Sequence, residues 1–168
     1  MENGDFCLGP PLEGRFRDVV RMHMAMGCSP LTRDNAVLAY TDGKMKFVAL
    51  FQDIEAAKDH INLQYYIIRD DGIGEQLIKL LTRKAQQGIS IYFLYDDIGS
   101  LSLPASYFQE FLHAGGKAKP SIASKLPINL RLNYRNHRKI AVIDGEIGYI
   151  GGFNVGDEYL GYDGRLGY

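Results

Sequence analysis

The chain has 168 residues, in which 19 lysine and arginine residues stand against 20 aspartate and glutamate residues, so the formal charge is −1. Hydrophobic residues make up 46% of the sequence and charged residues 23%, which is typical of one soluble globular domain with a buried core. The balanced charge excludes a global positive field that would hold the chain on nucleic acid or on an anionic bilayer, so any phosphate binding must be local.

The N-terminal region, residues 1–33, is predicted to be a poorly ordered lead with one short helix over residues 17–26. We interpret its methionines as packing surface rather than as a ligand set, because thioethers commonly fill irregular apolar gaps. Its two cysteines, Cys7 and Cys28, lack the spacing of a zinc site or a disulfide framework and indicate a reducing compartment. No apolar run approaches the roughly 20 residues needed to cross a bilayer, and no secretion signal is expected.

From Asn35 onward, extended and helical segments alternate, which predicts an α/β layer structure. Residues 36–41 and 45–50 flank Asp42-Gly43, and this arrangement predicts a short hairpin. A short helix over residues 52–59 and an apolar, aromatic strand over residues 60–68 are expected to follow.

The most regular helical pattern lies over residues 73–85, where Glu75 and Lys79 form a favourable pair one turn apart and Gly88 supplies the stop. A buried strand over residues 89–95 and a second helix over residues 104–114 are predicted next. Residues 117–128, with two prolines and two serines, are predicted to form a loop.

The segment from residue 129 onward carries the chemistry. Residues 140–143 form an apolar strand, and a second strand begins at Ile147, with Asp144-Gly145 predicted as a two-residue type I′ turn between them. Counting outward from that turn places His137 opposite Gly152 and brings Asn154 beside the imidazole.

His137 and Lys139 are two residues apart in an extended segment, so both side chains project from one face. Gly151 and Gly152 opposite them would leave a space without side chains. Such a space suits a tetrahedral phosphoryl group, because Lys139 and Asn154 can stabilise charge on its oxygens while His137 attacks phosphorus or moves a proton. This scheme needs no cofactor, and a cationic lysine would repel a metal.

Asp144 is predicted to have a structural role. About 23 Å of strand, at about 3.3 Å per residue, separates it from His137, and its parity places it on the other face. We therefore expect an Asx-type acceptor or an ion-pair partner at the turn. The alternative for the whole segment is a solvated basic face, but the turn and the Gly-Gly-x-Asn sequence beside His137 and Lys139 favour a phosphate site.

Further positions have two interpretations each. Asp96 and Asp97 end a strand and either cap the following loop, which we prefer, or face the site. Of two adjacent tyrosines that alternate across a strand, Tyr65 and Tyr66, one belongs to the core and the other can line the pocket. Glu158 either approaches the phosphate site or forms a surface ion pair, which we prefer.

The pattern H-x-K-x4-D-x6-G-G-x-N resembles the HKD motif of the phospholipase D superfamily. Four wider segments resemble bacterial cardiolipin synthases, namely residues 65–71, 95–100, 135–139 and 154–161. The similarity covers about residues 34–168, and we expect that span to form one half-domain.

The resemblance implies a phospholipase D-like mixed sheet flanked by helices, one half of an enzyme with pseudo-two-fold symmetry. It also implies phosphatidyl transfer between two phosphatidylglycerol molecules, which gives cardiolipin and glycerol through a phosphatidyl-histidine intermediate. Carried over to this chain, His137 is the nucleophile or its acid/base partner, while Lys139 and Asn154 hold the phosphate. The full-length family is expected at the cytoplasmic face of the cell membrane.

The chain departs from the family pattern in three ways. It holds one HKD motif instead of two, it lacks the usual transmembrane helices, and it stops at Tyr168 where the family continues and often supplies a carboxylate that steadies the first histidine. We therefore expect an N-terminal catalytic half that is nearly inactive until a second half or a homodimer partner completes it. The other expected partners are an anionic phospholipid such as phosphatidylglycerol and, through missing segments, the membrane; nucleic acid is not expected.

Two other functions remain open. A single-motif phosphodiesterase or nuclease would complete its site by homodimerisation, and a local patch of Arg131, Arg135, Arg138 and Lys139 would favour it, although the balanced charge argues against it. An inactive remnant would at most bind anionic headgroups. A second H-x-K-x4-D motif encoded beyond Tyr168 would distinguish the first hypothesis from these two.

Overall fold

The computed structural model describes residues 16–27, 35–121 and 135–162. It divides the chain into two compact units, Met1–Ala39 and Tyr40–Tyr168, which are described separately. The smaller unit contains α1, Arg17–Gly27, and this confirms the helix expected over residues 17–26. The rest of the predicted poorly ordered lead, apart from Phe16, and the predicted boundary after residue 33 lie outside the described residues, so both stay predictions.

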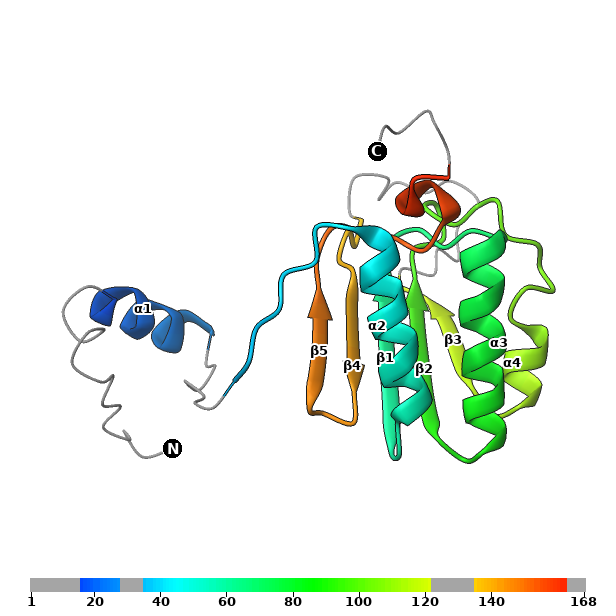
Figure 1. The fold of residues 1–168 in the computed structure, drawn as a ribbon, viewed down its shortest axis with the longest axis horizontal. Coiled ribbons are helices and arrows are strands. Elements are labelled where there is room, and N and C mark those ends of the chain that lie inside the picture. Colours follow the sequence, from blue (N-terminus) through cyan, green and yellow to red (C-terminus); the bar gives the residue numbers. More distant parts are fainter. Residues whose placement is uncertain (1–15, 28–34, 122–134, 163–168) are drawn as a thin grey trace. The chain divides into compact units, whose positions relative to one another are not determined.

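The larger unit is built on a five-stranded sheet with the order β3-β2-β1-β4-β5 (Figure 1). Its strands are β1 His60–Tyr65, β2 Ser90–Tyr95, β3 Lys117–Pro120, β4 Ile140–Ile143 and β5 Ile147–Ile150. β1, β2 and β3 run parallel, whereas β4 pairs antiparallel with both β1 and β5. The helices are α2 Gly43–Ala56, α3 Gly72–Gln86, α4 Gln109–His113 and the 3-10 helix η1 Asp157–Leu160.

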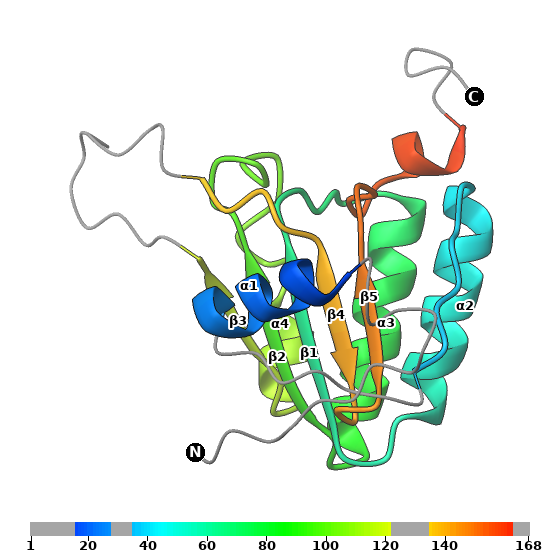
Figure 2. The same cartoon turned by 90° about the vertical axis from the view of Figure 1, so that its left-hand side faces the viewer.

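This mixed sheet with flanking helices confirms the predicted fold class. α2 and α3 lie side by side on one face of the sheet, as the views in Figures 1 and 2 show. Every second residue of β1 and β4 is buried, as are Ile91 and Phe93 of β2, because side chains alternate across a strand and one face meets the helices. Among the described residues, no helix is long and apolar enough to cross a membrane.

The helix predicted over residues 73–85 is confirmed as α3. Asp71 caps its N-terminus, where the carboxylate accepts a hydrogen bond from the Gly74 amide at 3.1 Å. The predicted pair of Glu75 and Lys79 is present at 2.7 Å. Gly88 has a φ of 91°, a left-handed conformation that glycine adopts at little cost where the chain leaves a helix.

The hairpin predicted around Asp42-Gly43 is wrong. Asp42 is instead the N-cap of α2, and its carboxylate accepts a hydrogen bond from the Met45 amide at 3.0 Å. The buried residues Phe47, Leu50 and Ile54 are spaced three and four positions apart, which is a helical period rather than the alternation of a strand. The short helix expected over residues 52–59 is therefore the C-terminal part of α2, which ends at Ala56.

The predictions for residues 104–121 need two corrections. The helix expected over residues 104–114 is confined to α4, because the preceding residues form turns in which the Tyr107 amide bonds to the Pro104 carbonyl oxygen at 3.0 Å. The segment predicted as a loop begins with a strand, β3, which pairs with β2. Its low strand propensity is overridden by this pairing, and Pro120 is tolerated because β3 lies at the edge of the sheet.

The turn between β4 and β5 is as predicted, but the register is not. Asp144 and Gly145 have φ values of 53° and 71°, and the Glu146 amide bonds to the Ile143 carbonyl oxygen at 3.0 Å, as a type I′ turn requires. The ladder nevertheless pairs Ile143 with Ile147, so Glu146 is one extra residue on the returning strand. The placement of His137 opposite Gly152 is therefore wrong by one residue, and the ladder ends before it reaches His137.

Candidate functional site

Four chain segments meet at the carboxyl end of β1. The segments after β1 and β2 lie there because the two strands are parallel, and the segment before β4 lies there because β4 is antiparallel to β1. The segment after β5 lies there because β5 is antiparallel to β4. Backbone hydrogen bonds join them: the Asp96 amide bonds to the Tyr65 carbonyl oxygen at 3.2 Å, and the Val155 amide bonds to the Ile67 carbonyl oxygen at 3.1 Å. The sheet thus brings most of the predicted site residues to one end.

His137 and Lys139 form the centre of this site. Nζ of Lys139 lies 2.9 Å from Nδ1 of His137 and 2.7 Å from the carbonyl oxygen of the same residue. The imidazole belongs to an exposed residue, whereas Lys139 is only 5% exposed. Burial lowers the pKa of Lys139, because desolvation disfavours the ammonium form.

Tyr66 covers one side of this couple. Its ring centroid lies 4.6 Å from that of His137, and Nζ of Lys139 lies 5.3 Å from the centre of the tyrosine ring. The neighbouring Tyr65 points to the other face and is buried in the core. The prediction that one of the two tyrosines belongs to the core is therefore confirmed for Tyr65, whereas a pocket-lining role for Tyr66 stays a prediction.

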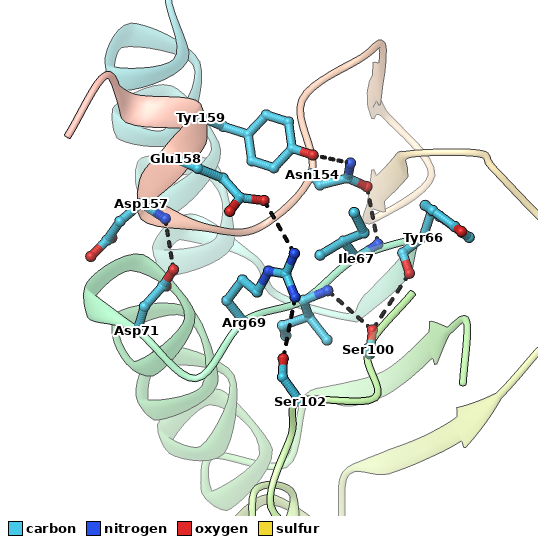
Figure 3. A network of polar contacts seen from close by, with 11 residues as sticks. Tyr66, Ile67, Arg69, Asp71, Ser100, Ser102, Asn154, Asp157, Glu158 and Tyr159 are labelled. Atoms are coloured by element: carbon cyan, nitrogen blue, oxygen red, sulfur yellow. Dashed lines mark hydrogen bonds and ion pairs between the residues drawn. The ribbon is translucent and has the colours of Figure 1, made fainter. Parts of the chain in front are cut away.

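Asn154 is buried and held by two hydrogen bonds (Figure 3). Its Oδ1 accepts from the Ile67 amide at 3.0 Å, and its Nδ2 donates to the hydroxyl of Tyr159 at 2.7 Å. The carboxamide therefore fastens the segment after β5 to the segment that carries Tyr66. The contact with Tyr159 uses one of the two hydrogens on Nδ2.

Gly151 and Gly152 are exposed, and a Cβ atom added to either would meet nothing within 4 Å. Neither glycine has a positive φ. Their backbone conformations would therefore accept other residues, and the lack of side chains keeps a space open between β5 and Asn154.

Asp144 lies at the opposite end of β4, in the β4–β5 turn, where its carboxylate binds backbone amides of a segment distant in sequence. Its carboxylate accepts hydrogen bonds from the backbone amides of Lys58, Asp59 and His60 at 2.8, 2.9 and 3.0 Å. These bonds lower the pKa of Asp144, with the Lys58 amide as the largest cause. The carboxylate thus ties the β4–β5 turn to the start of β1.

The remaining predicted acidic residues are paired. Asp96 caps the loop after β2, where its Oδ1 accepts from the amides of Ile98 and Gly99 at 3.0 Å each. Asp97 lies 3.0 Å from the guanidinium group of Arg135. Glu158 forms an ion pair at 3.6 Å with Arg69, as expected (Figure 3).

Two site residues were missed by sequence reasoning. Tyr159, on η1, bonds to Asn154, and Arg135 links the motif segment to the end of β2. The spacing of five residues between Asn154 and Tyr159 gives no signal, because it fits no regular helix or strand contact. Arg135 lies within the segment 135–139 that carries the family resemblance and within the predicted basic patch, but neither pattern predicts its contact with Asp97.

Comparison of the sequence with known proteins places the chain in one family. The family model described as "Cardiolipin synthase, PLD-like domain" matches residues 50–164. A cardiolipin synthase of Listeria monocytogenes serotype 4b (strain CLIP80459) is 48% identical over 165 residues, which covers 98% of this chain and 34% of the relative. A cardiolipin synthase of Oceanobacillus iheyensis is 45% identical over 168 residues, which covers 100% of this chain and 35% of the relative. The chain thus spans about a third of the length of these curated relatives.

A solved structure, that of NucT from Helicobacter pylori, has a similar fold, with a TM-score of 0.52 and 17% sequence identity. The match covers 72% of this chain and 74% of NucT. At this level of identity the likeness concerns the fold alone.

Proposed function

Because the chain belongs to the PLD-like domain family of cardiolipin synthases, we propose that it supplies one histidine-bearing half of a site for phosphatidyl transfer. The observation that carries the proposal is the exposed imidazole of His137 with the buried amine of Lys139 at 2.9 Å. The proposed substrate is phosphatidylglycerol, an anionic lipid, so the reaction takes place at a bilayer surface. A second imidazole comes from another half of a longer protein or from a second copy.

In the first step, a ring nitrogen of His137 attacks the phosphorus of one phosphatidylglycerol. A P–N bond forms, the P–O bond to the headgroup glycerol breaks, and the departing oxygen takes a proton from the second imidazole. In the second step, the headgroup hydroxyl of another phosphatidylglycerol attacks phosphorus and gives its proton back to that imidazole. The P–N bond then breaks, and cardiolipin is released.

Lys139 and Asn154 stabilise the phosphoryl oxygens. An anionic diester beside Nζ favours the ammonium form of Lys139, and it thereby offsets the effect of burial on the pKa of that group. The second N–H of the Asn154 amide donates to another oxygen, while Tyr159 holds the first. The open space above Gly151 and Gly152 accommodates the tetrahedral group.

A half-site can be tested with a substrate whose leaving group needs no proton. We would incubate the chain with phosphatidyl-p-nitrophenol in vesicles, follow p-nitrophenolate by absorbance and identify the modified peptide by mass spectrometry under alkaline conditions. The expected result is one equivalent of p-nitrophenolate and a phosphatidyl group on His137. His137→Ala should abolish both signals, whereas His113→Ala, a change at a histidine on α4, should leave them unchanged.

Undiminished release from His137→Ala, or an adduct on another residue, would contradict the proposal. Hydrolysis of a nucleic-acid phosphodiester at a rate that rises with the square of the chain concentration would instead support a homodimeric phosphodiesterase. Vesicle binding without any adduct would support the inactive remnant.

A further inference from the structure

The segment that carries the imidazole lies outside the strand ladder. Residues 135–139 precede β4, whose pairing with β1 and β5 begins at Ile140. A hydrogen bond from the Gly151 amide to the Lys139 carbonyl oxygen at 3.3 Å continues the pairing by one residue. The orientation of His137 therefore depends on contacts other than the sheet.

Arg135 provides such a contact from two residues upstream. Its Nη1 lies 3.0 Å from Oδ1 of Asp97 and 3.8 Å from Oδ1 of Asp96. The Arg135 side chain is 13% exposed, and the Asp96 side chain is fully buried. A buried carboxylate is costly without a positive partner, so removing the Arg135 guanidinium group from this position would be unfavourable.

The turn of residues 96–99, which carries both carboxylates, also supports the other side of the imidazole. Oδ1 of Asp96 accepts from the amide of Gly99, and a Cβ atom on Gly99 would lie 2.2 Å from the Tyr66 carbonyl oxygen. The Gly99 backbone is therefore in close contact with Tyr66, whose ring packs against His137 at 4.6 Å. Ser100 strengthens this contact, because its hydroxyl donates to the Tyr66 carbonyl oxygen at 3.4 Å.

We propose that the turn of residues 96–99 is a positioning element for His137, with Arg135 as its link to the motif segment. The turn contacts the imidazole region through two sets of contacts, which we call arms. The first arm consists of the carboxylates of Asp96 and Asp97 and their ion pairs with Arg135. The second arm consists of Gly99 and Tyr66. Both arms start from one short turn, so the imidazole is fixed from two sides relative to β2. The significance of this arrangement for phosphatidyl transfer rests on the proposed function, but the arrangement itself can be tested without it.

The decisive variant is Arg135→Lys, because it preserves the charge and removes the planar guanidinium group whose Nη1 lies near both carboxylates. Any change at His137 then comes from geometry and not from a change in the local charge. Asp97→Asn tests the same arm from the other end, at a side chain that is 32% exposed and tolerates substitution better than Asp96. Gly99→Ala tests the second arm, with Gly148→Ala as its control, since a Cβ on Gly148 would meet nothing within 4 Å.

The readout is the imidazole of His137 itself in the whole chain. Two-dimensional NMR of the histidine rings reports its tautomer, its titration and its position over the Tyr66 ring, and diethyl pyrocarbonate labelling reports its reactivity. We expect Arg135→Lys, Asp97→Asn and Gly99→Ala each to shift the His137 ring signals and to change its labelling rate several-fold. His23, His60 and His113 should keep their signals and rates. In the transfer assay, a displacement of about 1 Å should cost about 10²-fold in adduct formation.

Glu55→Gln is the matched control for loss of an ion pair, because Glu55 pairs with Arg83 on the surface of the helical layer. It should leave His137 unchanged even if the unfolding temperature falls. Unchanged His137 signals in folded Arg135→Lys and Asp97→Asn would overturn the proposal. If Arg135→Lys does not fold, Asp97→Asn and Gly99→Ala decide the question. A missing phosphatidyl adduct would contradict the proposed function but would leave this result intact, because labelling measures the imidazole and not transfer.

Discussion

Nζ of Lys139 lies 2.9 Å from Nδ1 of His137, so the two residues of the H-x-K pattern are within hydrogen-bonding distance of each other. The carbonyl oxygen of His137 also accepts from this amine at 2.7 Å. A buried amine needs such partners, because desolvation without hydrogen bonds is costly. A bound phosphate oxygen would take the place of one of them.

Replacing Lys139 should impair phosphoryl transfer without unfolding the chain. We expect Lys139→Met to reduce adduct formation from phosphatidyl-p-nitrophenol by about 10²–10³-fold, the usual effect of removing one group that stabilises transition-state charge. Thermal unfolding should be unchanged or shifted upward, because a desolvated amine is replaced by an apolar side chain. Lys119→Met, at an exposed position on β3, is the control and should retain the full rate. Full activity of Lys139→Met would remove this residue from the site.

Gly152→Ala should affect ligand binding without affecting the stability of the fold. A Cβ there meets nothing within 4 Å of the chain, so the unfolding temperature should stay the same. If the space above it holds the phosphoryl group, the added methyl group should raise the lipid concentration needed for half-maximal adduct formation. An unchanged concentration dependence would show that the phosphoryl group lies elsewhere.

Tyr159→Phe removes the acceptor of the Asn154 amide. The loss of this partly buried hydrogen bond should lower the free energy of unfolding by about 1 kcal/mol, measured by urea titration. The adduct should also form more slowly, because the amide is then held by the Ile67 amide alone and is less firmly oriented toward the phosphoryl group. Tyr162→Phe, at an exposed tyrosine near the same helix, should change neither quantity.

Asp144→Asn should destabilise the chain most at neutral pH. The pKa of Asp144 is lowered in the folded state, so its contribution is complete above the unfolded pKa of about 3.9 and is lost as the pH falls through the folded pKa. The difference in melting temperature between the original chain and the variant should therefore shrink between pH 7 and pH 3. Glu146→Gln, an exposed change in the same turn, should show no such trend. A constant difference over this range would contradict the assignment.

Lys46 gives the fold a pH dependence of its own. It is buried, its Nζ donates to the Tyr65 hydroxyl at 2.9 Å, and burial lowers its pKa to about 7. Between pH 7 and the unfolded lysine pKa of about 10.4 the unfolded chain binds more protons, so this group makes stability rise with pH by at most about 1.4 kcal/mol per pH unit. Lys46→Met should flatten this slope in urea titrations at pH 7 to 9, and an unchanged slope would contradict the assignment. Lys79→Met, at an exposed lysine on α3, is the control.

Local sequence patterns were sufficient to predict those elements whose conformation depends mainly on residues close to one another along the chain. The period of apolar residues and the cap at Asp71 define α3, and the two positive φ values at Asp144-Gly145 follow from the residue types. The H-x-K spacing likewise fixed that His137 and Lys139 share one face. Asp42-Gly43 shows the limit of such patterns, because the same pair begins a hairpin or caps a helix, and only the buried face of α2 decides between them.

The sequence by itself determined the chemical groups of the site and their order along the chain. Only the tertiary structure decided which partners they have: Asn154 bonds to Ile67 and Tyr159, and Arg135 reaches Asp97 across the sheet end. One extra residue at Glu146 also shifted the β4–β5 register, which a count from the turn did not detect. The physical reason is that these contacts join segments far apart in sequence, and their geometry depends on how the strands pair and not on any local spacing.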